Sequence, residues 1–228
     1  MQPLVIAIDG PSGVGKSSTS RGVAQQLGLA YLDTGSMYRA IAIGCQAGGI
    51  LQDRDGVIGF AMRADLALGT DPASPTIALN GVDVTDEIHL PAVSADVSIV
   101  ATNQEVRDIL TAQMREIIDQ SGGIVVEGRD ITTVVYPQAQ VRVLLVANQA
   151  VRMARRQAQI DGQLTSDELK DQVLRRDRDD GTVSNFETPA AGVTLIDSTD
   201  MSLDEVITAI IALVPSGTDA GDQVTSNL

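Results

Sequence analysis

The amino-acid sequence predicts an α/β fold in which a five-stranded parallel sheet carries helices on both faces. Short apolar runs alternate along the chain with amphipathic stretches of helical period, a pattern typical of a parallel sheet wrapped by helices. Hydrophobic residues make up 43% of the chain, whereas aromatic residues make up only 2%, so the core is expected to be aliphatic. The length of 228 residues suits one large domain with a small insert.

The strands are expected where apolar runs lie between turn residues. The expected strands are Leu4–Ile8, Leu29–Asp33, Ile124–Glu127, Val141–Val146 and Val193–Ile196.

Several helix ends can be placed from capping patterns. The first helix should begin at Gly15–Lys16 and end at Gly28, because glycine is the preferred residue just beyond a helix. A second, with its apolar residues on one stripe, is expected over Gln104–Gln120. The patterns Thr165-x-x-Glu168 and Ser202-x-x-Glu205 are capping boxes that predict two further helix starts.

One segment, about residues 63–91, interrupts the alternation. Thr76–Leu79 and Val82–Val84 flank Asn80-Gly81, which predicts an antiparallel hairpin with a type I′ turn. From residue 215 to residue 228 the chain loses all periodicity, and we expect a disordered tail. The sequence is therefore interpreted as a single domain over residues 1–214 with a functional insert.

Composition narrows the possible partners. A net charge of −14 argues against binding to nucleic acid or to an anionic membrane surface. The single cysteine, Cys45, permits no internal disulfide and fits a reducing compartment. Met1–Ile8 lack the basic segment of a secretory signal, and no apolar run approaches the roughly 18 residues of a membrane span. A cytoplasmic monomer is expected.

The most specific pattern is G-x-x-x-x-G-K-[ST], which lies between an expected strand and an expected helix. Its glycines let backbone N–H groups surround a phosphate, and the helix N-terminus adds partial positive charge. Lys16 is expected to reach the β- and γ-phosphates, and the hydroxyl of Ser17 to bind Mg²⁺. The residues expected to bind ATP here are Gly10, Pro11, Ser12, Gly13, Val14, Gly15, Lys16, Ser17 and Ser18.

The phosphate loop alone does not fix the function, because GTPase switches, ATPase motors and small-molecule kinases share it. A guanine-specific switch is expected to carry Asn-Lys-x-Asp after a strand, and the sequence has no such element. Motors usually need a much longer chain. A kinase is therefore favoured.

Two further motifs follow expected strands, at the edge of an open α/β sheet where ligands bind. In Asp33-Thr34-Gly35-Ser36-Met37-Tyr38-Arg39, the guanidinium of Arg39 can bind an acceptor phosphate with two hydrogen bonds. In Gly128-Arg129-Asp130, Arg129 supplies positive charge and Asp130 an acceptor. A carboxylate accepts from the N4 amine of cytosine but repels the carbonyl of uracil.

With these motifs the sequence resembles bacterial cytidylate kinases, whose pattern at the first of them is Asp-[Ser/Thr]-Gly-x-x-Tyr-Arg. The resemblance covers nearly the whole chain except the tail. It implies a P-loop kinase core with a small antiparallel insert that binds the nucleoside monophosphate, and a helical lid. It also implies transfer of the γ-phosphoryl group of ATP to CMP or dCMP in pyrimidine nucleotide metabolism. The segments that carry it further along the chain are Asn80–Ile88, Val93–Ala101, Val106-Arg107, Glu127–Val135 and Arg176–Asp180.

The resemblance also implies roles for individual residues. Ser98, Arg107 and Asp130 would read the base, and Arg39 and Arg129 would hold the phosphate of CMP. Asp180, with Arg176, would hold the ribose. The full expected acceptor site is Thr34, Tyr38, Arg39, Ser98, Arg107, Arg129, Asp130, Arg176 and Asp180, and the expected catalytic residues are Lys16, Arg129, Asp130 and Arg155.

A lid over about residues 148–180 is expected to close arginines over the transferring phosphoryl group and to exclude water. Arg155 is the expected contact with ATP; the alternative is a helix whose arginines pair with nearby carboxylates. Glu127, at the end of a strand, is expected to act with Ser17 in the Mg²⁺ site. The alternative for Glu127 is a solvated or helix-capping carboxylate, and the same two interpretations apply to Asp33.

The sequence departs from the family pattern at two positions. Val183 stands where arginine is common, so one phosphate or ribose contact is either missing or supplied by another arginine such as Arg178, and His89 replaces a common arginine in the insert. We expect His89 to be an exposed residue of the insert. Three alternative functions remain open: a kinase for UMP, dTMP, shikimate or gluconate, a GTP-binding switch, and a nucleotide-binding protein without catalysis.

Overall fold

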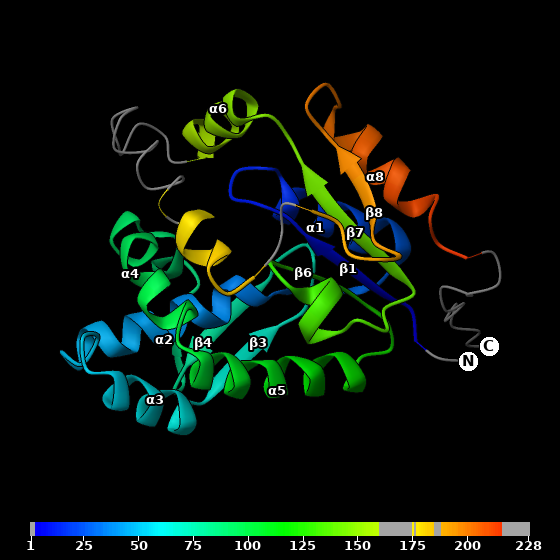
Figure 1. Ribbon diagram of the computed structural model, residues 1–228. Coiled ribbons are helices and arrows are strands. Elements are labelled where there is room, and N and C mark those ends of the chain that lie inside the picture. Colours follow the sequence, from blue (N-terminus) through cyan, green and yellow to red (C-terminus); the bar gives the residue numbers. More distant parts are fainter. Residues whose placement is uncertain (1–2, 160–174, 176, 185–187, 216–228) are drawn as a thin grey trace, which may run out of the picture.

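The computed structural model describes residues 3–159, 175, 177–184 and 188–215. A parallel sheet crosses the molecule, with a smaller antiparallel sheet to one side of it (Figure 1). The predicted helix start at Thr165-x-x-Glu168, Arg176 and most of the predicted tail lie outside the described residues.

The main sheet contains the strands that the sequence predicts, in the order β2-β6-β1-β7-β8 and all parallel. Four of the five strands begin or end one residue away from the predicted bounds, and Val141–Val146 matches them. Pairing with the neighbouring strand sets where each strand begins and ends. The observed strands are β1 Val5–Asp9, β2 Ala30–Asp33, β6 Ile124–Gly128, β7 Val141–Val146 and β8 Thr194–Asp197.

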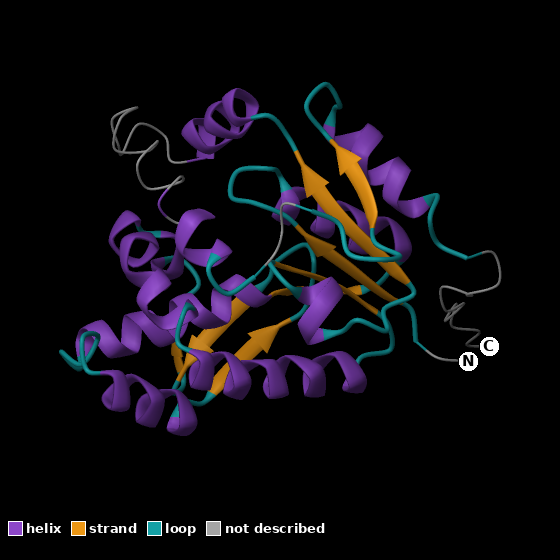
Figure 2. Cartoon of the chain, in the orientation of Figure 1, coloured by secondary structure: helices purple, strands orange, loops and turns teal. Residues whose placement is uncertain are grey.

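Helices cover both faces of this sheet (Figure 2). The side chains of β1 alternate between two aliphatic cores: Val5 and Ala7 face one, and Ile6 and Ile8 face the other. Helices α1 (Lys16–Leu27) and α8 (Leu203–Ile211) pack on the second face. The other helices, which cover the first face or the carboxyl edge, are α2 Thr34–Ala47, α3 Arg54–Arg63, α4 Pro91–Ala101, α5 Gln104–Gln120 and α6 Gln149–Gln159.

The predicted caps of α1 and α8 are present, and α5 has a cap that was not predicted. Gly28 ends α1 in the left-handed conformation, with a φ of 64°. Asn103 accepts hydrogen bonds from the first turn of α5, and Ser202 and Glu205 form the predicted capping box of α8. Over the residues that the structure describes, no helix combines the length and the apolar character that a membrane span requires.

The insert contains the predicted antiparallel hairpin and a third antiparallel strand that the sequence analysis did not predict. Asn80 and Gly81 have φ values of 50° and 79°, so the predicted type I′ turn is confirmed. The additional strand, β3, has only four residues and no alternation, so the sequence gives no strand signal there. The strands are β3 Leu66–Gly69, β4 Thr76–Leu79 and β5 Val82–Asp83, and a 3₁₀ turn follows at Glu87–His89.

The capping box of α8 gives a direct test of the fold. Ser202→Ala removes the side-chain acceptor of the Glu205 amide, and we expect a loss of about 1 kcal/mol in the free energy of unfolding. Urea denaturation measures it. Thr208→Ala, at an exposed position of the same helix, is the control and should change stability by less than about 0.5 kcal/mol. Equal losses in both variants would contradict a specific capping contribution.

Candidate active site

The glycine-rich loop between β1 and α1 lies tightly against its surroundings. A Cβ atom on Gly10 would lie 2.2 Å from the carbonyl oxygen of Leu145, and one on Gly13 would lie 2.6 Å from that of Arg152. Both glycines have positive φ, so a side chain is excluded by conformation as well as by space. Lys16 Nζ donates to the carbonyl oxygens of Gly10, at 2.8 Å, and Pro11, at 3.0 Å. The ammonium group is therefore held over the loop.

Two carboxylates lie beside this loop because β2 and β6 pair in parallel with Asp33 opposite Glu127. The hydroxyl of Tyr31 donates to Glu127 Oε1. Burial, reinforced by the charge of Asp33, raises the pKa of Glu127 to about 7. Burial also opposes ionisation of Asp33, but the guanidinium of Arg39, 3.2 Å away, keeps its pKa below the usual value.

Asp33 also caps a helix, which was the alternative considered for it. Its side chain accepts from Ser36 N at 3.3 Å and so stabilises the start of α2. The hydroxyl of Thr34 donates to the carbonyl oxygen of Glu127 at 2.8 Å. These bonds fix the start of α2 against β6, and Arg39, one turn further along α2, is directed to the same edge.

Arg107, on α5, forms a buried ion pair with Asp130. The guanidinium also donates to the carbonyl oxygen of Ala101, at 3.1 Å, and to the hydroxyl of Ser184, at 3.2 Å. Burial raises the pKa of Asp130, although Arg107 opposes that shift. Two of the three residues predicted to read the base, Arg107 and Asp130, are thus neighbours and are bound to each other.

A second group of ion pairs joins the phosphate loop to residues 177–180. Arg129 donates to the carbonyl oxygen of Gly10 at 3.0 Å and pairs with Asp177 at 3.0 Å and with Asp180 at 3.1 Å. Asp177 also accepts from Ser12 N at 3.0 Å and pairs with Arg152. Burial alone would raise the pKa of Asp177, but Arg129, Ser12 N and Arg152 together lower it.

Asp177 is a site residue that the sequence interpretation missed. It lies between arginines in an alternating charged stretch, and nothing in that pattern distinguishes a carboxylate that contacts the loop from a solvated one. The separation of 165 residues between Asp177 and Ser12 also makes the contact invisible in the sequence.

Many of these residues line one continuous cleft, although Asp177 and Arg152 do not. Other lining residues that the sequence analysis did not place in the binding or catalytic sites include Gly35, Val97, Ala101, Arg156 and Ser184. The predicted site residues that line the cleft are Ser12, Gly13, Gly15, Lys16, Ser17, Thr34, Tyr38, Arg39, Arg107, Glu127, Arg129, Asp130 and Asp180. The predicted residues that are described but do not line it are Gly10, Pro11, Val14, Ser18, Ser98 and Arg155.

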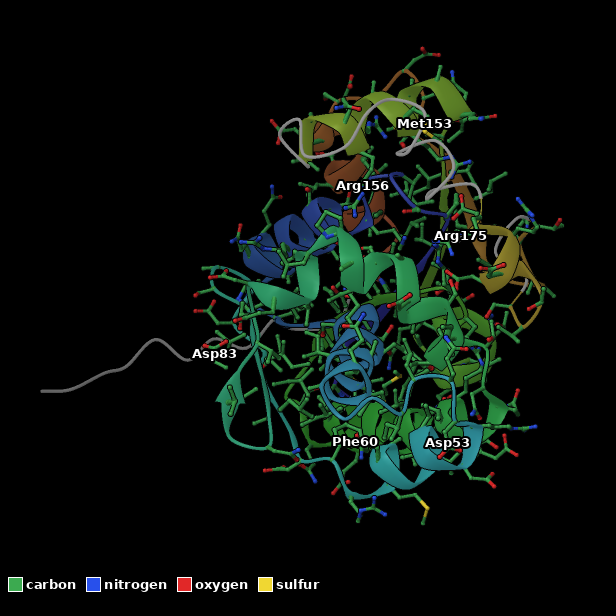
Figure 3. The ribbon with its side chains drawn as sticks, turned by 90° about the vertical axis from the view of Figure 1, so that its left-hand side faces the viewer. Asp53, Phe60, Asp83, Met153, Arg156 and Arg175 are labelled. Atoms are coloured by element: carbon green, nitrogen blue, oxygen red, sulfur yellow. The ribbon has the colours of Figure 1, made fainter. Side chains whose placement is uncertain are left out.

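The arginine of α6 that lines the cleft is Arg156 rather than Arg155. Arg155 donates to the carbonyl oxygens of Val14, at 2.9 Å, and Ser198, at 2.8 Å, and so holds the loop against the end of β8. Arg156 lies on the side of α6 that faces the rest of the chain (Figure 3). Burial, followed by the nearby charge of Arg39, lowers its pKa. Arg156 is therefore the α6 guanidinium that approaches the predicted acceptor site.

Three further positions singled out in the sequence analysis are Ser98, His89 and Val183. Ser98 is buried in α4, and Val97 and Ala101 of the same helix line the cleft in its place. His89 is exposed, as predicted. Val183 brings no charge to the cleft, and the adjacent Ser184 contacts Arg107 instead.

A parallel sheet whose first strand leads into a glycine-rich phosphate loop, facing a second group of arginines across one cleft, defines a P-loop phosphotransferase. A family model described as cytidylate kinase matches residues 6–216. The chain belongs to the cytidylate kinase family.

Its similarity to named relatives extends over almost their whole length. A cytidylate kinase of Cutibacterium acnes is 57% identical over 216 residues, which cover 93% of this chain and 96% of that protein. A cytidylate kinase of Nocardia farcinica is 42% identical, with coverage of 96% and 97%. Among solved structures, a gluconokinase from Sinorhizobium meliloti superposes with a TM-score of 0.47 at 14% identity, over 93% of this chain and 92% of that one.

The buried Arg107–Asp130 pair makes a prediction about stability. Arg107→Met leaves the Asp130 carboxylate buried and unpaired, and we expect a loss of about 3–5 kcal/mol in the free energy of unfolding at neutral pH. Without Arg107, the folded-state pKa of Asp130 rises further above its unfolded value. The loss should therefore shrink as pH falls and Asp130 becomes protonated.

Urea denaturation at pH 5 and pH 8 would measure both effects. Arg54→Met, which removes an exposed partner of Glu105, is the matched control and should have little effect at either pH. A loss in Arg107→Met that is the same at both pH values would contradict the assignment to an unpaired carboxylate.

Proposed function

We propose that this protein transfers the γ-phosphoryl group of ATP to CMP or dCMP, giving ADP and CDP or dCDP. The observation that carries the proposal is the single cleft that contains both Lys16 of the phosphate loop and the Arg107–Asp130 pair. Membership of the cytidylate kinase family supports the same reaction.

The donor nucleotide binds at the loop between β1 and α1. Backbone N–H groups and the N-terminus of α1 bind its phosphates, and Lys16 moves from the loop carbonyls onto the β- and γ-phosphate oxygens. Arg155 acts indirectly here, because its guanidinium holds the loop through Val14.

The acceptor nucleotide binds between α2, α5 and the end of β6. Arg39 and Arg129 bind its phosphate, and Asp180, next to Arg129, binds the ribose. Asp130 accepts from the N4 amine of cytosine, with its orientation fixed by Arg107. For uracil the same position carries a carbonyl oxygen, which would lie against a carboxylate, and the base is rejected.

Transfer takes place in line between the two bound nucleotides and relies on positioning and electrostatic stabilisation. Arg129 and Arg156, which both line the cleft, neutralise charge on the transferring group. No covalent enzyme intermediate is needed. Closure of the insert over CMP, and of the lid helices over ATP, excludes water and suppresses wasteful hydrolysis.

The groups near the phosphate loop suit Mg²⁺, which prefers oxygen ligands and keeps part of its water shell. Ser17, Asp33 and Glu127 all line the cleft beside the loop. Ser17 would bind the ion, and Glu127 would hold it directly or through a water. The ion would neutralise charge on the β- and γ-phosphates. The proposal also includes that the protein is a monomer and that it acts in the cytoplasm.

Substrate choice tests the acceptor site. In a coupled assay of ADP release, CMP and dCMP should be good acceptors, whereas UMP, dTMP, shikimate and gluconate should be poor ones. Asp130→Asn should lower the ratio of kcat/KM for CMP over UMP by about tenfold or more, because an amide can pair with either base edge. Asp55→Asn, at an exposed position of α3, is the charge-matched control. An unchanged ratio in Asp130→Asn would exclude its role as base reader.

Loss of the loop ammonium tests the donor site. Lys16→Ala should reduce turnover with every acceptor by roughly 100-fold or more, since it removes a charge aimed at the transferring phosphoryl group. Arg63→Ala removes one positive charge from an exposed position and should leave turnover unchanged. Near-normal rates in Lys16→Ala would rule out transfer at this loop.

A further inference from the structure

The side chain of Asp9, the last residue of β1, does not face the phosphate loop that begins at the next residue. Its carboxylate accepts from Ile131 N at 2.8 Å, Thr132 N at 2.8 Å and the hydroxyl of Thr132 at 2.7 Å. All three bonds go to the segment that directly follows Asp130. Asp9 is only 2% exposed, so no water competes for these donors.

The segment that Asp9 contacts is one unusual turn. Residues Ile131–Val135 form a π-helical turn, in which Val135 N and Tyr136 N donate to carbonyl oxygens five residues earlier. The first amides of such a turn have no partner within it. Asp9 supplies partners for the amides of Ile131 and Thr132, which would otherwise be buried without hydrogen bonds.

A carboxylate at this depth is costly. Burial raises the pKa of Asp9 to about 6, even though the bonds from Thr132 and Ile131 favour the charged form. A packed aliphatic pair could fill this space without that cost. The carboxylate gives the turn a defined orientation. Its two oxygen atoms bind three donors, and these bonds fix the position of the first residues of the turn.

The fixed start of the turn determines where Asp130 points. Asp130 has a φ of −149° and a ψ of 25°, which is neither strand nor helix, and its carbonyl oxygen accepts from Val134 N at 2.8 Å. The peptide that follows Asp130 carries the Ile131 amide bound to Asp9, so its orientation and the backbone conformation of Asp130 are set together. Arg129, on the other side, donates to the carbonyl oxygen of Gly10, the neighbour of Asp9.

We propose that Asp9 is a positioning residue for acceptor selection: through Ile131 and Thr132 it holds the turn after β6 so that Asp130 presents its carboxylate to the base. The inference rests on the proposed role of Asp130 and adds to it a residue that does not touch the nucleotide. Asp9 also joins the two halves of the site, because it is covalently continuous with the phosphate loop and hydrogen-bonded to the acceptor segment.

The test compares Thr132→Val, which removes one bond to Asp9, with Asp9→Asn, which disturbs all three. Each should lower the CMP-to-UMP ratio of kcat/KM roughly tenfold, mainly through a raised KM for CMP, with the KM for ATP within about twofold of wild type. Thr132→Ser keeps the hydroxyl and should therefore have the same CMP-to-UMP ratio as wild type. Val134→Thr alters an exposed side chain of the same turn and is the control.

The outcomes separate this inference from the proposed function. Asp130→Asn is measured in parallel: an unchanged ratio there would overturn the base-reading role and this inference with it. A reduced ratio in Asp130→Asn, together with unchanged ratios in Thr132→Val and Asp9→Asn, would overturn the role of Asp9 alone. Equal losses with CMP and UMP would show that Asp9 only stabilises the fold. Circular dichroism checks folding, and if Asp9→Asn does not fold, Thr132→Val decides.

Discussion

The site depends on the register of three neighbouring parallel strands. β2, β6 and β1 end together, with Asp33 opposite Glu127 and Asp9 opposite Gly128. Each chain segment that leaves this edge therefore begins within reach of the others: the phosphate loop from β1, α2 from β2, and the Arg129–Asp130 segment from β6. A shift of one residue in any strand would turn its last side chain to the opposite face of the sheet and separate the groups that the reaction requires.

Positive charge is concentrated in the cleft, although the chain as a whole is strongly acidic. The overall value is −14, yet the cleft contains arginines from α2, α5, α6 and the end of β6. Among the described residues, three of them are paired with carboxylates: Arg39 with Asp33, Arg107 with Asp130, and Arg129 with Asp177 and Asp180. These pairs hold the guanidinium groups in position without leaving like charges unopposed. Nucleotide phosphates, which carry several negative charges, can bind the same donors when the cleft fills.

The sequence predicted the strands, the phosphate loop, the caps of α1 and α8 and the type I′ turn, because each of these depends on residues close together in the chain. It also placed Arg39, Arg129 and Asp130 in one candidate site, because motifs that follow parallel strands meet at the same edge of the sheet. It did not reveal the roles of Asp9 and Asp177, whose partners lie 122 and 165 residues away. Nor could it separate Arg155 from Arg156, because neighbouring helical residues point in different directions and only packing decides which one reaches the cleft.

The central claim is that donor and acceptor nucleotides occupy one cleft with their phosphates adjacent. A compound that joins adenosine and cytidine through five phosphates would span both sites, and titration calorimetry would measure its binding. The account predicts one equivalent bound, more tightly than ATP or CMP alone, with the compound displaced by either nucleotide. Binding no tighter than that of ATP, together with displacement by ATP but not by CMP, would contradict a shared cleft.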